Sequence, residues 1–315
     1  MEARVIKVGT RQSQLALTQT GQVIRQLEEL CKEHQLPYSF EIHKIVTKGD
    51  RILDVTLSKV GGKGLFVKEI EQALLNSDID LAIHSMKDMP YELPEGLAIG
   101  AVPKRLTPQD CLVLKDGYSF EDLPQGAKVG TSSLRRSSQL KYARPDLDIQ
   151  WIRGNIDSRI RKLETEGFDA IVLAAAGLAR MGWEHKISTL LPADVCVPAV
   201  GQGALGVQCR SSDKSVMELL ALLNDHDSEV TVAAERSFLG TLQGGCQVPI
   251  GAHATIVERV DSKEVLELTG IVGSPDGATL LKSVQQGTDP VQLGIEVARQ
   301  LLDDGARDIL AKIEG

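Results

Sequence analysis

Short apolar runs alternate with longer amphipathic segments through the first two thirds of the chain. The apolar run 5–8 leads through the turn 9–13 into a helical pattern whose apolar face carries Val23, Ile24, Leu27, Leu30 and Cys31. A second apolar run covers 40–46, a helical stripe then carries Phe66, Ile70, Ala73 and Leu74, and a buried strand follows at 79–84. Strands that alternate with helices predict a parallel sheet covered on both faces.

The chain also contains an internal echo. Lys7-Val8-Gly9-Thr10 recurs letter for letter at 128–131, and both copies are followed by Ser and Arg and then by a helical pattern. The strand 79–83 has a counterpart at 168–172, again late in its unit. The spacing has the size of a domain, so we interpret the echo as two similar folds rather than a solenoid.

Beyond Leu205 the pattern changes. It predicts helices at 214–223 and 229–239, strands at 252–258, 264–272 and 279–285, and a helix at 291–302 that closes the chain. The turn Ser274-Pro275-Asp276-Gly277 separates two of these strands. We expect a small α+β domain of antiparallel strands with helices on one side.

Composition excludes several classes of protein. Among 315 residues aromatic side chains make up 3% and the net charge is −8, which argues against a surface that stacks nucleic-acid bases. Five scattered cysteines are too few for a disulfide framework and favour a reducing compartment. The longest apolar run, 170–179, is too short to cross a membrane, and the N-terminus does not read as a secretion signal. We therefore expect a cytoplasmic protein without a membrane or nucleic-acid partner.

Basic residues concentrate between Lys128 and Lys162. Nine basic residues stand there against three acidic ones, which creates a positive field suited to an anion. Arginine dominates, and its planar fork binds carboxylate or phosphate through two hydrogen bonds. We expect Arg135 and Arg136 to contact a ligand, together with hydroxyls at the start of the following helix. For Lys141, Arg144, Arg161 and Lys162 we favour a solvated basic face.

Two further positions suit a site at the carboxyl ends of the strands. Arg11 and Ser13 follow the first strand of their unit, as residues 131–136 follow the equivalent strand of the second unit. The alternative is that Thr10 or Ser13 caps the helix and that Arg11 is a surface residue. Asp88 follows Lys87 at the end of a strand and is the first catalytic candidate, as an acceptor of a substrate N–H group and a stabiliser of positive charge. Capping of the turn before Pro90 is the alternative for Asp88.

Other motifs carry less weight. Cys246 lies in a Gly-Gly-Cys loop without a neighbouring base, so it is a candidate attachment point, whereas Cys31, Cys111, Cys196 and Cys209 suit core positions. The GxGxxG match at 201–206 runs into an extended segment and is a weak nucleotide site. The loop 61–64 lacks the spacing of an ATP site, and the six histidines form no metal-binding pattern.

Together these residues resemble the porphobilinogen deaminase (hydroxymethylbilane synthase) family over essentially the whole chain. The resemblance rests on seven motifs in order, at 9–13, 61–66, 84–88, 130–136, 153–155, 198–203 and 244–249. It implies a transferase of porphyrin and heme biosynthesis that condenses four porphobilinogen molecules head to tail, loses ammonia at each step and releases hydroxymethylbilane.

The resemblance also implies a role for each site residue. A dipyrromethane cofactor would be joined through a thioether to Cys246, and Asp88 would be catalytic. Cofactor carboxylates would be bound by Lys87, Thr131, Ser133, Arg135, Arg136 and Arg159. Substrate would be bound by Arg11, Ser13, Arg153 and Arg159, with Lys63 and Phe66 on a loop that covers the cleft. No metal is implied.

The implied fold is α/β, with two domains like periplasmic binding proteins, a cleft between them and a small C-terminal α+β domain. We expect the first domain at 1–103 and 200–222, the second at 104–199, and the cofactor-bearing domain at 223–315. We expect a monomer acting on a small molecule. The arginines and the echo alone would equally fit a non-catalytic module that binds polyanions, and Cys246 distinguishes the two readings because such a module needs no modified thiol.

Overall fold

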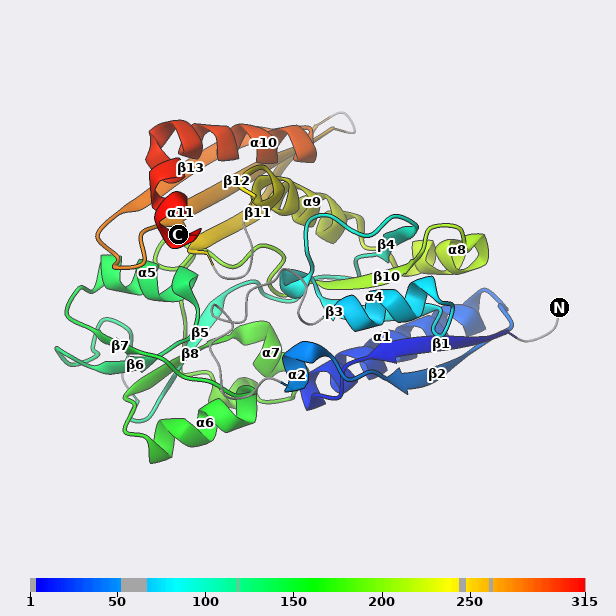
Figure 1. The fold of residues 1–315 in the computed structure, drawn as a ribbon, viewed down its shortest axis with the longest axis horizontal. Coiled ribbons are helices and arrows are strands. Elements are labelled where there is room, and N and C mark those ends of the chain that lie inside the picture. The colour runs from blue at the N-terminus through cyan, green and yellow to red at the C-terminus, as the bar shows by residue number, and fades with distance from the viewer. Residues whose placement is uncertain (1–3, 52–66, 118, 244–247, 261–262, 315) are drawn as a thin grey trace. The chain divides into compact units, whose positions relative to one another are not determined.

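The structure is a computed structural model that describes residues 4–51, 67–117, 119–243, 248–260 and 263–314. Two compact units form the chain: one comprises Met1–Arg105 and Ala204–Glu229, and the other comprises Leu106–Gly203 and Val230–Gly315. Within the described ranges, the strands assemble into two five-stranded sheets and one three-stranded sheet (Figure 1).

The first unit is built on a mixed sheet with the order β2-β1-β3-β10-β4. Strand β1 runs parallel to β2 and β3, while β10 runs antiparallel to β3 and β4. The elements are β1 (Arg4–Thr10), α1 (Gln14–Glu33), β2 (Tyr38–Lys44), α2 (Lys48–Arg51), α4 (Lys68–Leu75), β3 (Leu81–Ser85), the 3-10 turn η1 (Met86–Asp88), β4 (Leu97–Ala101), β10 (Leu205–Arg210) and α8 (Lys214–Leu223).

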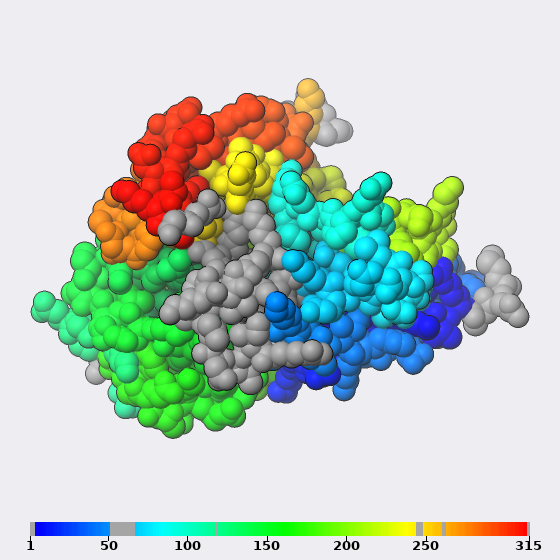
Figure 2. All heavy atoms as spheres, viewed as in Figure 1, coloured from blue at the N-terminus to red at the C-terminus, as the bar shows by residue number. Residues whose placement is uncertain are grey.

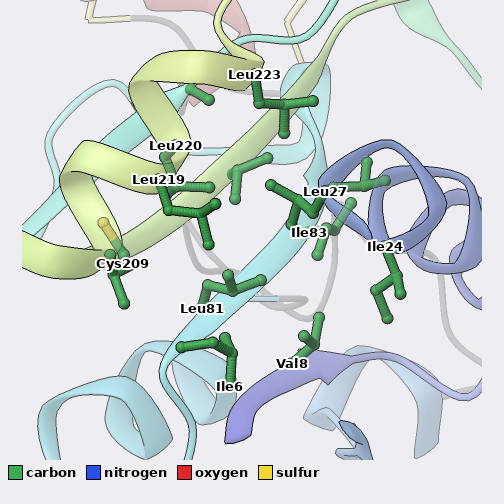
Figure 3. Packing of buried hydrophobic residues seen from close by; sticks show 14 of the residues in the cluster. Ile6, Val8, Ile24, Leu27, Leu81, Ile83, Cys209, Leu219, Leu220 and Leu223 are labelled. Atoms are coloured by element: carbon green, nitrogen blue, oxygen red, sulfur yellow. The ribbon is translucent and has the colours of Figure 1, made fainter. Parts of the chain in front are cut away.

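Helices cover both faces of this sheet, as the pattern predicts. Leu81 and Ile83 of β3 pack with α1 and α8, where Leu27 and Leu220 are completely buried (Figure 3). The intervening Ala82 packs on the opposite face with Ile70 and Leu74 of α4. Alternate strand residues thus enter two separate cores.

The second unit contains a sheet with the equivalent order, β7-β6-β8-β5-β9. Its elements are β5 (Asp110–Leu114), β6 (Lys128–Gly130), α5 (Leu134–Ala143), β7 (Asp148–Gln150), α6 (Ile156–Thr165), β8 (Ala170–Ala174), α7 (Ala175–Arg180), η2 (Glu184–Lys186) and β9 (Thr189–Leu190). Strand β6 is parallel to β7 and β8, and β5 is antiparallel to β8 and β9.

The repeated segment in the sequence corresponds to a repeated pair of hydrogen bonds in the two sheets. The backbone N–H of Asp80 donates to Lys7 O, and a carboxylate oxygen of Asp80 accepts from Lys7 N at 2.9 Å. Asp169 makes the same two bonds with Lys128, at 2.9 and 2.7 Å. The prediction of two similar folds is confirmed.

The predicted sheet direction was wrong in part, because each five-stranded sheet is mixed and not parallel. Strand β10 lies more than a hundred residues after β3 in the chain, yet it pairs with β3 in the antiparallel sense. Hydrophobic periodicity reports which residues are buried and carries no information on the direction of a strand that returns from elsewhere in the chain.

The third sheet is antiparallel and contains β11 (Ile250–Val260), β12 (Lys263–Gly273) and β13 (Leu280–Gly287). Helices α9 (His226–Thr241) and α10 (Pro290–Leu301) cover one face, since a Cβ atom added at Gly270 would meet both Phe238 and Val297. The chain does not close with the predicted helix: after the π-helical turn η3 (Leu302–Ala306), where Gly305 has φ 109°, it forms α11 (Arg307–Glu314). In Figure 2, α10 and α11 lie at the surface.

The fold class is therefore α/β with a small C-terminal α+β part, as expected. The sequence-derived domain boundaries stay a prediction. Within the described ranges, none of the helices has the length and apolar character that crossing a membrane requires.

Candidate active site

A pocket in the first unit forms where β1 and β3 end. Because parallel strands finish at the same edge of a sheet, the turn after β1 and the η1 turn after β3 lie next to one another. The pocket is lined by Arg11, Ser13, Leu15, Ala16, Gln19, Val67, Ile83, His84, Ser85 and Asp88. The catalytic candidate Asp88 thus shares a pocket with the two substrate-binding candidates of this unit, Arg11 and Ser13. Asp88 and the adjacent Lys87 are both half-buried.

Arg11 is held in place by the carboxylate of Asp50, which no sequence pattern indicated. Its Nε donates to Asp50 Oδ1 at 3.1 Å, and its Nη2 donates to the same oxygen at 2.5 Å. Burial acts to raise the pKa of Asp50, but hydrogen bonds from Arg11 and Thr47 outweigh it, so the pKa lies below its usual value. Arg11 is thereby an oriented guanidinium in the pocket wall and not a surface arginine.

Ser13 and Gln19 come from helix α1. Ser13 is the N-cap, and its Oγ accepts from Ala16 N at 3.3 Å, so the capping alternative is confirmed for this residue. Gln19 Nε2 donates to Ser85 Oγ at 3.0 Å, which links α1 to the N-cap residue of η1. Gln19 is a buried polar residue on the inner side of an amphipathic helix, and that is the sequence signal that could have singled it out.

The second unit contains a buried arginine cluster around Asp110, the first residue of β5. Arg135 Nη1 donates to Asp110 Oδ2 at 2.7 Å, while Arg136 Nε and Nη2 both donate to Oδ1, at 3.0 and 2.7 Å. Asp110 is completely buried, and Arg135 and Arg136 are 4% and 6% exposed. Burial acts to raise the pKa of Asp110, but the two guanidinium charges outweigh it and hold the pKa far below its ordinary value.

Neutral groups complete this cluster. Gln202 Nε2 donates to Asp110 Oδ1 at 2.9 Å, and the carbonyls of Val197 and Val172 accept from Arg135 and Arg136. The loop that matched GxGxxG therefore contributes a hydrogen bond to the arginine cluster. It continues into strand β10 and not into a helix, as expected for a weak nucleotide motif. Sequence patterns indicate the two arginines but neither Asp110 nor Gln202 as part of this cluster.

Thr131 and Ser133 shape the start of α5. Ser133 is the N-cap and accepts from Arg136 N at 3.4 Å, and Thr131 Oγ1 accepts from Ser133 N at 3.2 Å. The hydroxyls therefore lie at the beginning of a helix, as the sequence predicted. Their contact with a cofactor stays a prediction.

Arg153 and Arg159 flank the turn that opens α6. Asn155 caps this helix, and Arg159 Nε donates to Gly154 O at 2.8 Å. Burial, followed by the like charges of Arg136 and Arg153, lowers the pKa of Arg159 to about 10. These side chains form a positive region in which a bound anion would be stabilised.

The expected solvated basic face needs one correction. Arg161 is 72% exposed, but Arg144 binds Asp146 and donates to the carbonyls of Phe120, Glu121 and Leu123. Arg144 therefore links the end of α5 to the loop that precedes β6.

Arg180 is a further buried arginine that no sequence pattern indicated. It donates to Gly203 O at 2.8 Å, and burial lowers its pKa to about 10.

Cys246, Lys63 and Phe66 lie outside the described residues. The other four cysteines are buried, which confirms their predicted place in the core. In the described ranges there is no group of three or more His, Cys, Asp or Glu side chains that could hold a metal ion.

The sheets define an α/β protein, and its second unit contains a buried arginine cluster. Family models match two segments: "Porphobilinogen deaminase, dipyromethane cofactor binding domain" matches residues 6–218, and "Porphobilinogen deaminase, C-terminal domain" matches 229–303. The chain is 59% identical to the porphobilinogen deaminase of Paenibacillus macerans, covering 98% of this chain and 99% of the relative. It is 56% identical to that of Halalkalibacterium halodurans, covering 99% and 98%. The chain belongs to the porphobilinogen deaminase family.

A solved structure extends the comparison. A YaeC-family lipoprotein from Enterococcus faecalis aligns with a TM-score of 0.42 at 14% identity, over 71% of this chain and 93% of that chain.

Proposed function

We propose that the chain is a transferase that condenses four porphobilinogen molecules head to tail, with loss of ammonia, to give hydroxymethylbilane in tetrapyrrole biosynthesis. The observation that carries this proposal is the family match, which extends over nearly the whole chain and nearly the whole of its relatives. The pocket around Asp88 is the structural feature that agrees with it, because an acid lies there beside an oriented arginine.

The second unit suits a cofactor that carries carboxylates. Four arginines gather there, two of them around the single carboxylate of Asp110. Because the pKa of Arg159 is lowered by burial and by like charges, a bound carboxylate would relieve the repulsion that these arginines exert on one another. The donor set thus fits dipyrromethane. When bound, that group supplies the pyrrole carbon to which the first substrate is joined.

Our assignment of the residues follows the family motif. Cys246 is the proposed point of attachment, through a thioether. Arg135 and Arg136, whose guanidinium groups are held by Asp110, are proposed cofactor ligands, with Lys87, Thr131, Ser133 and Arg159 as further cofactor ligands. Arg11, Ser13, Arg153 and Arg159 would bind substrate carboxylates, and Lys63 and Phe66 would contact substrate from their loop.

Asp88 is the proposed catalytic acid. A carboxylate on the η1 turn after β3 would accept a hydrogen bond from the pyrrole N–H and stabilise the positive charge that develops as ammonia leaves. Arg11 lines the same pocket and would bind a substrate carboxylate, which orients the pyrrole ring toward Asp88.

We further propose a monomer in the cytoplasm that acts on its small-molecule substrate without a nucleic-acid partner. The net charge of −8, the low aromatic content and the scattered cysteines support this assignment. Light scattering on the purified protein tests the oligomeric state.

Turnover of porphobilinogen by wild type, Asp88→Asn and Asp78→Asn tests the proposed reaction. Asp78 is exposed, so the control makes the same chemical change outside the pocket. We expect Asp88→Asn to lower kcat by roughly 100- to 10,000-fold and Asp78→Asn to have little effect. Wild type that consumes no porphobilinogen would refute the function, and active Asp88→Asn would refute the role of Asp88.

A further inference from the structure

Three buried polar side chains in the first unit form a chain of hydrogen bonds, called the relay below, that has no role in the proposed reaction. His84 lies on β3, Gln208 on β10 and Glu71 on α4, and they are 5%, 0% and 6% exposed. His84 Nε2 lies 3.1 Å from Gln208 Oε1, and Gln208 Nε2 donates to Glu71 Oε1 at 3.2 Å. His84 is also part of the wall of the pocket that contains Asp88.

The register of the sheet explains why these side chains meet. His84 pairs with Gly206, and Gln208 pairs with Ala82, so His84 and Gln208 point to the same face. Ala82 packs on that face with α4, the helix that carries Glu71. The relay therefore connects two neighbouring strands to the helix that covers them.

The relay determines which nitrogen of His84 carries the proton. A carboxylate oxygen of Glu71 accepts hydrogen bonds, so the amide of Gln208 turns its NH₂ group to Glu71 and its oxygen to His84. That oxygen also only accepts, and Nε2 of His84 must be the donor. In a neutral imidazole Nδ1 is then left as an acceptor.

Burial favours the neutral form of the ring. Arg11 and Asp88 line the pocket with it, and Glu71 lies beyond Gln208. Burial, together with the positive charge of Arg11, lowers the pKa of His84 to about 4, although the hydrogen bond to Gln208 acts in the opposite direction. His84 therefore keeps one charge state throughout the neutral range.

We propose that His84 is a positioning residue for the reaction at Asp88, held by Gln208 and Glu71 as a neutral imidazole with its proton on Nε2. This inference rests on the proposed function. His84 immediately precedes Ser85, the N-cap of η1, and Asp88 ends η1. Fixing His84 against β10 and α4 fixes the backbone that carries the Asp88 carboxylate. A neutral ring also leaves the charge of the pocket constant while ammonia and protons are released there.

Nitrogen-15 NMR of the histidine rings tests the state of His84 directly, without substrate. We expect one His84 signal set of the neutral Nε2–H tautomer, unchanged between about pH 5.5 and 8, and assigned by its loss in His84→Asn. A His84 ring that is protonated at neutral pH, or that carries its proton on Nδ1, would overturn the proposal. The state of the ring is measured in wild type, and His84→Asn serves only to assign the signal.

The variant Glu71→Gln tests the link to catalysis, with Glu69→Gln as a matched control on the same helix. Glu69 accepts from Lys48 N and is not part of the relay. An amide at position 71 no longer fixes the orientation of Gln208, so we expect a second tautomer of His84 and roughly a tenfold fall in kcat with KM little changed.

A mixed-tautomer ring in Glu71→Gln with wild-type kcat would refute the positioning role. An equal loss of kcat in Glu69→Gln would do the same. Failure of wild type to consume porphobilinogen would instead refute the proposed function, and the NMR result on His84 would still decide the state of the relay.

Discussion

Two nitrogens of Arg136 donate hydrogen bonds to the same oxygen of the buried Asp110 carboxylate, at 3.0 and 2.7 Å. Arg135 occupies the other oxygen. Two adjacent residues of one helix thereby share a single counter-ion on strand β5. The arrangement fixes both guanidinium groups inside the second unit, and it makes Asp110 the residue on which the geometry of the arginine cluster depends.

Replacement of Asp110 by Asn should therefore destabilise the second unit strongly. The two arginines would remain buried without their carboxylate, and breaking a buried ion pair in this way costs about 3 to 5 kcal/mol. Urea unfolding measures the loss. Asp157→Asn is the control, because its pair with Arg161 lies at the surface and contributes less than about 1 kcal/mol. Equal stability of the two variants would contradict the structural role of Asp110.

The lowered pKa of Asp110 predicts how the stability of the folded protein depends on pH. The pKa of Asp110 is lowered in the folded protein, so its stabilising contribution is complete above the pKa of the unfolded chain, near 4, and is lost as the pH falls further. Urea unfolding of wild type should show stability decreasing below about pH 4. In Asp110→Asn this decrease should be smaller. An identical acid dependence in both proteins would contradict the assignment.

Substitution of Gly154 should destabilise the turn between Arg153 and Asn155. Its φ is +120°, and an added Cβ would lie 2.6 Å from Ser158 Oγ. Gly154→Ala should cost about 1 to 3 kcal/mol through backbone strain and raise KM by displacing Arg153 and Arg159. Gly167→Ala is the matched control, since Gly167 also has positive φ but its Cβ would meet nothing within 4 Å. We expect the control to lose stability while its KM stays unchanged.

Arg159 should contribute to binding and not to stability. Burial and like charges oppose its positive charge in the folded chain, as its lowered pKa shows. Arg159→Gln should therefore leave the unfolding free energy equal or higher, while KM for porphobilinogen rises about tenfold because a charged hydrogen bond is lost. Arg161→Gln, two residues further along α6 and 72% exposed, should change neither quantity. A large loss of stability in Arg159→Gln would indicate a structural residue.

Local sequence patterns predicted much of this fold. The repeated Lys-Val-Gly-Thr segment correctly predicted two similar units, because equivalent residues such as Asp80 and Asp169 must make equivalent bonds to begin a strand beside β1 or β6. Ser133 was correctly placed at the start of a helix, since its hydroxyl suits an N-cap. Such features depend on neighbours in the chain, and the sequence displays those neighbours directly.

Partners that are distant in the sequence were missed. Asp110 begins a buried apolar strand, and nothing near it indicates that it will meet Arg135 and Arg136. Gln208 and Glu71 are 137 residues apart and meet only because β10 returns antiparallel beside β3. Pairing of this kind follows from the topology of the sheet, which periodicity does not encode.

The central claim is that a dipyrromethane group is attached to Cys246 and that the arginines and Asp88 act around it. Intact-mass spectrometry of the purified active protein tests this claim most directly, with Cys246→Ser as the comparison. We predict that wild type is heavier than its translated polypeptide by one dipyrromethane and that the serine variant is not. Active wild type with the mass of the bare polypeptide would contradict the account.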